Sequence, residues 1–206
     1  MEISFIRHGP SCCKSHQKCN VTQFKKWIQN YDQMGMFKDT VVSLDTIRKC
    51  REAALMITSP PVRTVQSART ILPGMEKKMM ESNMFREAEL PIFEHIPSFI
   101  RLKPHTWAFF FRLLWMVLYK GKVETYRQAV RRAQKASEIL SEYARIHGKV
   151  VFVGHGIFNR MVAKELKKQG WKGEYPPCRH HFYCTTYVQG ERGSDEYVPP
   201  SLNRQR

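Results

Sequence analysis

The sequence predicts a three-layer α/β fold with a mainly parallel central sheet, formed by a single domain over residues 1–206. Short apolar, β-branched runs alternate with longer segments of helical periodicity, which is the pattern of such folds. One sequence pattern also recurs three times along the chain: an apolar strand, a turn of small residues and then a helix. With 206 residues and 42% hydrophobic composition, the chain can enclose one sizeable core.

Each expected element has a local cause. Apolar and β-branched runs predict strands over 2–6, 53–58, 149–153 and 182–188. The segment 79–85 is either a further strand or an extended crossing. Apolar residues at helical spacing predict helices over 22–31, 43–51, 61–71, 125–147 and 158–168, with Thr22 as the N-cap of the first. The polar tail after about residue 190 is expected to be mobile.

The first strand ends on the tripeptide Arg7-His8-Gly9. Gly9 permits a tight turn, and Pro10 prevents the strand from continuing. Ligands of open α/β sheets bind at the carboxyl ends of the strands, so Arg7 and His8 are candidate ligand-binding residues.

The same arrangement returns twice. The strand over 53–58 meets a Ser-Pro-Pro turn and then a helix whose first turns contain Arg63. The strand over 149–153 ends at His155, which glycines flank on both sides, and another helical pattern follows. Helix N-termini attract anions through free N–H groups and the helix dipole. Two histidines and two arginines can therefore converge on one dianion, and phosphate fits best.

These motifs resemble the histidine phosphatase superfamily, also called phosphoglycerate mutase-like. The matching pieces are Arg7-His8-Gly9 with Ser11, Ser59-Pro60-Pro61-Val62-Arg63 with Gln66-Ser67-Ala68, and Val153-Gly154-His155-Gly156. The small bacterial phosphatases of this superfamily are also similar at Trp27-x-x-x-Tyr31-Asp32-x-x-Gly35, at 85–91 and at 155–160. The resemblance spans most of the chain and implies a three-layer α/β/α sandwich with one antiparallel edge strand.

The resemblance implies a phosphohistidine mechanism with His8 as the nucleophile. A neutral imidazole suits this role because it adds no like charge when it attacks a phosphomonoester dianion. Its second ring nitrogen should donate a hydrogen bond to a backbone carbonyl. Arg7 and Arg63 carry planar, permanently charged groups suited to phosphoryl oxygens. His155, protonated, would be a further cation, and no metal or other cofactor is expected.

An alkoxide leaving group needs a proton from an acid. By resemblance this acid is a carboxyl group between the second arginine and the second histidine, and Glu87 is the expected residue. Glu89 is the alternative because only Ala88 separates the two. Ser11 is a further candidate for binding phosphate. Pro10 stands where many family members have Glu, which leaves the substrate contacts of the first loop open.

Three function classes remain. The expected one is a metal-independent phosphatase that acts on a small phosphorylated metabolite and releases inorganic phosphate. An alternative is phosphoglycerate mutase-type phosphoryl transfer, although the fuller lid and acidic motif of the mutases are not found. The other alternative is a non-catalytic basic module that binds anions or nucleic acid. The intact set of two histidines and two arginines argues against this alternative. The sequence makes no prediction of the oligomeric state.

The charge balance is strongly basic, with a net charge of +16. The basic residues are dispersed and accompany no nucleic-acid-binding motif, so we expect no nucleic-acid partner. We attribute the excess of positive charge to the phosphate site, to a solvated surface of Lys and Arg side chains, and to electrostatic steering of anionic substrates. The most apolar stretch, 107–119, is too short to span a bilayer. With no signal peptide evident, we expect a cytoplasmic protein without a membrane partner.

The insert over about 92–126 is rich in aromatic residues. They crowd one expected helix, at Trp107, Phe109, Phe110, Phe111, Trp115 and Tyr119. A helix in the core or over the sheet edge is favoured, and a cap that shapes the substrate pocket is the alternative.

The cysteines, at positions 12, 13, 19, 50, 178 and 184, are expected to be free thiols. Cys12 and Cys13, close to the first motif, are candidates for oxidation. Neither Cys13-x-x-His16-x-x-Cys19 nor Cys178-x-His180-His181-x-x-Cys184 has the spacing of a familiar zinc site, so no metal site is expected.

Overall fold

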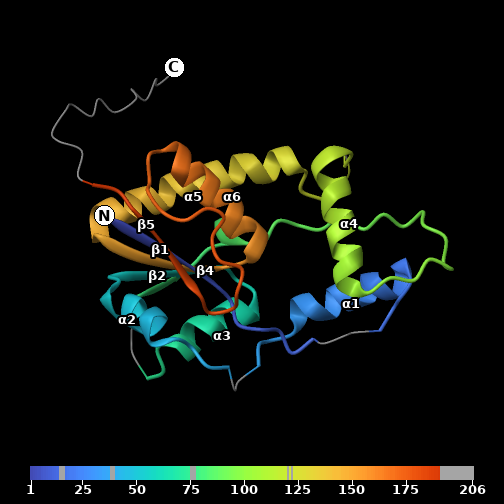
Figure 1. Cartoon of the computed structure of the whole chain (residues 1–206), viewed down its shortest axis with the longest axis horizontal. Coiled ribbons are helices and arrows are strands. Elements are labelled where there is room, and N and C mark those ends of the chain that lie inside the picture. Colours follow the sequence, from blue (N-terminus) through green and yellow to red (C-terminus); the bar gives the residue numbers. More distant parts are fainter. Residues whose placement is uncertain (14–16, 38–39, 75–77, 120, 122, 191–206) are drawn as a thin grey trace, which may run out of the picture.

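The computed structural model in Figure 1 describes residues 1–13, 17–37, 40–74, 78–119, 121 and 123–190. The tail expected to be mobile lies almost entirely outside these residues. Among them, the strands form one sheet in the order β3-β2-β4-β1-β5. Their bounds are β1 Glu2–Arg7, β2 Leu55–Thr58, β3 Met79–Glu81, β4 Lys149–Gly154 and β5 Cys184–Val188.

The sheet is mainly parallel. Strand β4 is parallel to both β1 and β2, and β2 is parallel to β3. Strand β5 is antiparallel to β1 and lies at the edge. The predicted α/β fold with one antiparallel edge strand is therefore confirmed.

Helices cover both faces of the sheet. Helices α5 (Tyr126–His147) and α6 (Gly156–Lys168) pack against Val150 and Phe152 on one face. Residues of α2 (Leu44–Glu52) and α3 (Val62–Ile71) share the other core with Val151 and Val153. Successive residues of β4 thus enter opposite cores, as the two-residue period of a strand requires, and its apolar run follows from burial on both sides.

Helices α1 (Val21–Gln33) and α4 (Pro104–Val117) pack on each other beyond the sheet (Figure 1). The expected core helix of the insert is α4, since Trp107, Phe111 and Trp115 are buried. Its partner in that core is α1 and not the sheet edge. Phe109 and Phe110 are exposed, at 60% and 47%. Within the described ranges, no helix is both long enough and apolar enough to cross a lipid bilayer.

Several element boundaries differ from the prediction. Thr22 is not the N-cap of α1, because Asn20 accepts the Gln23 N–H and forms a capping box with it. The segment 79–85 divides into the short strand β3 and a 3-10 turn, η1 (Asn83–Phe85). A bulky residue in the left-handed region, Phe182 with φ 59°, delays the start of β5.

Candidate active site

Two of the predicted residues meet because β1 and β4 are neighbours. Arg7 pairs with Gly154 in the sheet register, so His8 and His155 each follow directly at the same edge. The His8 N–H donates to the Gly154 carbonyl at 3.0 Å, and the two ring centroids lie 5.1 Å apart. Both side chains are buried, with 3% and 1% of their surface exposed.

The His8 ring is held in one tautomer. Its Nδ1 lies 2.7 Å from the Gly9 carbonyl oxygen, which can only accept, so Nδ1 carries the proton. Burial, aided by His155 and Arg63, lowers the pKa of His8 well below its usual value. The imidazole is therefore neutral and its Nε2 has a free lone pair. The predicted hydrogen bond to a backbone carbonyl is present.

His155 occupies the N-cap position of α6, and its Nε2 lies 2.6 Å from the Ser59 hydroxyl. Burial and the charges of Arg63 and Arg7 lower its pKa to about 3. This lowered pKa favours a neutral His155 in the protein without a bound anion. The protonated form, which was expected around a bound phosphoryl group, stays a prediction.

The two predicted arginines border the same histidines. The Arg7 Nη1 donates to the Arg179 carbonyl at 2.6 Å. Arg63, near the start of α3, donates through Nη1 to the Tyr31 carbonyl at 3.2 Å. Its guanidinium carbon lies 4.9 Å from the centre of the Tyr31 ring. The end of α1 therefore holds Arg63, although α1 contributes no catalytic candidate.

Three of these residues share one feature. Within the described part of the chain, Arg7 Nε, Arg63 Nε and His155 Nδ1 are buried without a hydrogen-bond partner. Buried donors in native proteins are nearly always paired, and leaving one unpaired costs roughly 1–3 kcal/mol. An anion with several acceptor oxygens is the ligand that this set of nitrogens suits.

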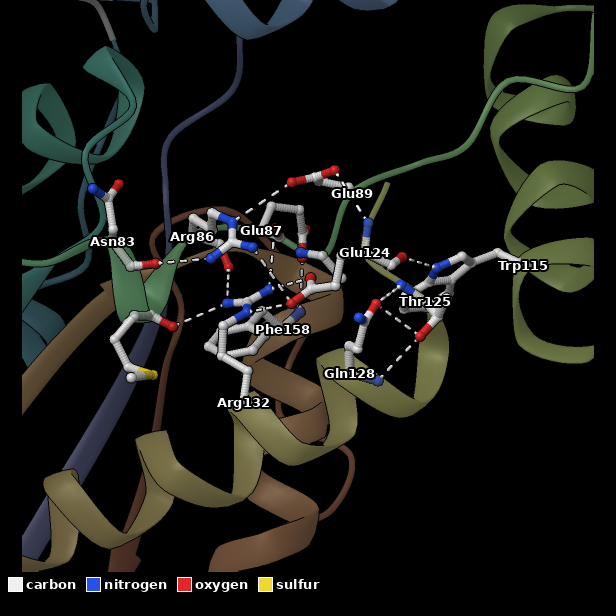
Figure 2. A network of polar contacts seen from close by, with 12 residues as sticks. Asn83, Arg86, Glu87, Glu89, Trp115, Glu124, Thr125, Gln128, Arg132 and Phe158 are labelled. Atoms are coloured by element: carbon white, nitrogen blue, oxygen red, sulfur yellow. Dashed lines mark hydrogen bonds and ion pairs between the residues drawn. The ribbon is translucent and has the colours of Figure 1, made fainter. Parts of the chain in front are cut away.

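The structure distinguishes the two glutamate candidates. The Glu87 carboxylate accepts the backbone N–H groups of Ile157 at 3.3 Å and Phe158 at 2.9 Å. It therefore lies at the N-terminus of α6, directly after His155, where the helix dipole favours negative charge. Glu89 is exposed, and its carboxylate accepts the Glu124 N–H at 3.4 Å (Figure 2).

Ser11 is less well placed. Its hydroxyl accepts the Cys13 N–H at 3.2 Å, which ties it to its own loop. Among the described residues it has no hydrogen bond to either site histidine or either arginine. The structure therefore brings together Arg7, His8, Arg63, Glu87 and His155, without linking Ser11 or Glu89 to them.

A buried ion pair below the Glu87 loop was not anticipated from the sequence (Figure 2). Arg132 of α5 contacts both Glu124 oxygens, through Nε at 2.7 Å and Nη2 at 2.6 Å. Its Nη1 also donates to the carbonyls of Met84 at 2.9 Å and Arg86 at 2.8 Å. The pair thereby fixes the backbone that leads into Glu87. The helical pattern of α5 contains no signal that would single out Arg132 from its basic neighbours.

Helix α4 holds the following part of the same loop. Arg112 donates to the Ala88 carbonyl at 3.0 Å and the Glu89 carbonyl at 2.9 Å. The insert thus contributes to the site by positioning the loop of Glu87.

A role for His181 at this site was not anticipated from the sequence. Its Nδ1 lies 2.5 Å from the His8 carbonyl oxygen. Its ring centroid is 5.6 Å from that of His8. The available signal was a histidine just before the edge strand that pairs with β1.

The six cysteines are all free. Burial raises the pKa of the Cys13 thiol, which makes it less reactive than an ordinary cysteine. His16, one member of the zinc sets considered, lies outside the described residues. Across the ranges that are described, no group of three or more potential metal-ligating side chains gathers.

Comparison with known families agrees with the sequence motifs. A family model described as the histidine phosphatase superfamily (branch 1) matches residues 44–196. This match includes the segments of Arg63, Glu87 and His155, whereas Arg7 and His8 precede it and join them through strand pairing. No curated protein matches the chain in sequence.

Several solved structures share the fold. YhfR of Bacillus stearothermophilus is 18% identical with a TM-score of 0.53, over 90% of this chain and 89% of that one. The α-ribazole phosphatase of Shigella flexneri is 14% identical with a TM-score of 0.53, over 93% of this chain and 92% of that one. A phosphoserine phosphatase of Entamoeba histolytica is 12% identical with a TM-score of 0.51, over 91% of this chain and 90% of that one. At these identities the likeness establishes the fold.

Proposed function

The chain belongs to the histidine phosphatase superfamily, and from this we propose that it is a metal-independent phosphomonoesterase that works through a phosphohistidine. The proposed substrate is a small phosphorylated metabolite, and inorganic phosphate is the product. One observation carries the proposal: His8, with a free Nε2, converges with three buried, unpartnered nitrogens of Arg7, Arg63 and His155.

In the first step His8 Nε2 attacks the phosphorus in line with the leaving oxygen. A P–N bond forms, the P–O ester bond breaks, and Glu87 donates a proton to the departing oxygen. Arg7, Arg63 and the Nδ1–H tautomer of His155 donate hydrogen bonds to the phosphoryl oxygens as the transferring group flattens. Because the two arginines are permanently charged, they supply the stabilisation that a metal ion provides in other phosphatases.

In the second step water attacks the phosphohistidine. Glu87 removes a proton from the water, the P–N bond breaks, and phosphate leaves with His8 restored. The contact of Glu87 with the start of α6 supports this assignment because it fixes the carboxyl group beside His155.

The test is hydrolysis of p-nitrophenyl phosphate in the presence of EDTA by wild type, His8→Ala and His95→Ala. His95 is exposed and serves as the matched histidine control. We expect wild type and His95→Ala to be equally active and His8→Ala to lose at least about a thousandfold in kcat. An acid-labile phosphoenzyme should form in wild type and be absent from His8→Ala.

Other outcomes would assign the site differently. Wild type that binds inorganic phosphate but neither hydrolyses esters nor forms a phosphoenzyme is an anion-docking module. Isomerisation of phosphoglycerates without net hydrolysis would identify the mutase alternative. Activity that disappears in EDTA and returns with a divalent metal would contradict metal independence.

A further inference from the structure

Residues 179–182 wrap around the end of β1, where the nucleophile candidate lies. The Arg7 side chain donates to the Arg179 carbonyl at 2.6 Å. The Phe182 N–H donates to the Arg7 carbonyl at 2.9 Å. Between these contacts, His181 Nδ1 lies 2.5 Å from the His8 carbonyl oxygen. The segment is therefore fixed to the backbone of both Arg7 and His8.

A strained residue sets the direction of this segment. Phe182 has a φ of 59°, in the left-handed region that a bulky side chain rarely adopts. Its ring is 2% exposed and lies against Gly9, where an added Cβ would be 2.7 Å from the ring. Its carbonyl accepts the Thr46 hydroxyl at 2.9 Å. Such strain persists only where several contacts hold it, and it concentrates at functional sites.

The hydrogen bond to His8 determines which nitrogen of His181 remains available. A carbonyl oxygen only accepts, so Nδ1 of His181 carries the proton and Nε2 is the remaining polar atom. The His181 ring is half-buried, and its centroid lies 5.6 Å from that of His8, close to the 5.1 Å between His8 and His155. The His181 ring is therefore nearly as close to the His8 ring as the His155 ring is.

We propose that His181 is a third histidine of the phosphoryl-binding site and that its Nε2 contacts an oxygen of the bound phosphomonoester. This inference rests on the proposed function. Burial and the nearby Arg7 and His180 lower the pKa of His181, while its bond to the His8 carbonyl raises it. Because Nδ1 donates to the His8 carbonyl, the ring takes up a second proton from solvent when a dianion enters and then donates from Nε2 to a phosphoryl oxygen.

A pair of near-isosteric substitutions separates contact with phosphate from support of the backbone. His181→Asn keeps a donor close to the Nδ1 position and removes the distal nitrogen. His181→Gln keeps a donor close to the Nε2 position and removes the one that reaches His8. His95→Asn is the matched control, because His95 is exposed and is not among the groups that shift the pKa of His181. We would measure KM and kcat for p-nitrophenyl phosphate, and the Kd of inorganic phosphate by calorimetry.

If Nε2 contacts phosphate, His181→Asn should weaken phosphate binding and raise KM by roughly tenfold or more, since it removes a hydrogen bond to a charged group. His181→Gln should stay within about threefold of wild type in both values. His95→Asn should match wild type. Equal melting temperatures of the variants would show that folding is intact.

The reverse pattern would overturn the inference. Normal phosphate affinity in His181→Asn, together with reduced kcat in His181→Gln, would mean that His181 only supports the His8 carbonyl. Normal values in both variants would exclude either role. The proposed function is contradicted by a different result, namely that wild type hydrolyses no ester. In that case the Kd of inorganic phosphate for the His181 variants still shows whether His181 binds the anion.

Discussion

The guanidinium of Arg132 pairs with both carboxylate oxygens of Glu124, at 2.7 and 2.6 Å, and donates at 2.8 Å to the carbonyl of the residue before Glu87. Both side chains are nearly buried, and the guanidinium carbon lies 4.0 Å from the centre of the Phe158 ring (Figure 2). One ion pair therefore links α5, the Glu87 loop and the first turn of α6. The position of the candidate acid depends on it.

We expect Arg132→Met to destabilise the protein by about 3–5 kcal/mol, because it leaves Glu124 as a buried charge without its main partner. The kcat should also fall, since the carbonyls around Glu87 lose their donor. Urea unfolding and steady-state kinetics measure the two effects. Arg131→Met is the control, because Arg131 is the exposed neighbour. Equal stability of the two variants would contradict a structural role for the pair.

Glu87→Gln should reduce hydrolysis of an alkyl phosphomonoester by roughly 10²–10⁴-fold, the usual contribution of a general acid. The loss in kcat/KM should be much smaller with p-nitrophenyl phosphate, whose leaving group needs little protonation. The kcat should still fall with this substrate, because Glu87 is also the base of the second step. Glu89→Gln should retain wild-type activity on both substrates, because Glu89 is exposed and bonded to Glu124. Loss of activity in Glu89→Gln but not in Glu87→Gln would identify Glu89, and not Glu87, as the general acid.

Acid should destabilise the protein through its buried histidines. The pKa of His155 is about 3 when folded, against about 6.5 in an unfolded chain. Between these values the unfolded state binds more protons, so the free energy of unfolding decreases as the pH falls from about 6.5 towards 3. His8, whose pKa is also lowered by burial, acts in the same direction.

This pH dependence can be measured by urea unfolding at about pH 7 and about pH 5. The loss of stability on acidification should be smaller in His155→Gln than in wild type, whereas the exposed-site variant His95→Gln should behave like wild type. An identical loss in His155→Gln and wild type would show that His155 is not buried in its neutral form.

Gly9→Ala should destabilise the protein by about 1–3 kcal/mol, because a new methyl group would overpack a buried site. The added Cβ would lie 2.7 Å from the ring of Phe182, which is itself held in the core. Unfolding in urea gives the free energy. Gly190→Ala is the control, since no atom of the residues that the structure describes lies within 4 Å of a Cβ at that position. Adding Phe182→Leu to Gly9→Ala should recover part of the lost free energy of unfolding. If it recovers none, the clash with Phe182 is not the cause of the destabilisation.

Much of the site followed from the sequence because it depends on local signals. Apolar runs located the strands, and the residue after each run had to lie at one edge of a parallel sheet. Arg7, His8 and His155 could therefore be placed together before any long-range contact was known. Arg63 followed in the same way, because the turn after β2 leads directly into α3.

The remaining features depended on contacts between distant segments. The resemblance favoured Glu87 over Glu89, and the contacts of Glu87 with the start of α6 and of Arg132 with the Glu87 loop are visible only in the structure. The lowered pKa of His155 could not be anticipated, because burial beside two arginines has no local signature. His181 reached His8 because β5 pairs with β1 across most of the chain.

The sequence by itself determined the order of strands and helices and the residues at the strand ends, since periodicity and turn chemistry act over a few neighbouring residues. Only the tertiary structure showed which glutamate contacts the start of α6, how deeply His8 and His155 are buried, and that His181 lies beside His8. Those properties arise from burial and from hydrogen bonds between segments far apart in the chain, and no local pattern encodes them.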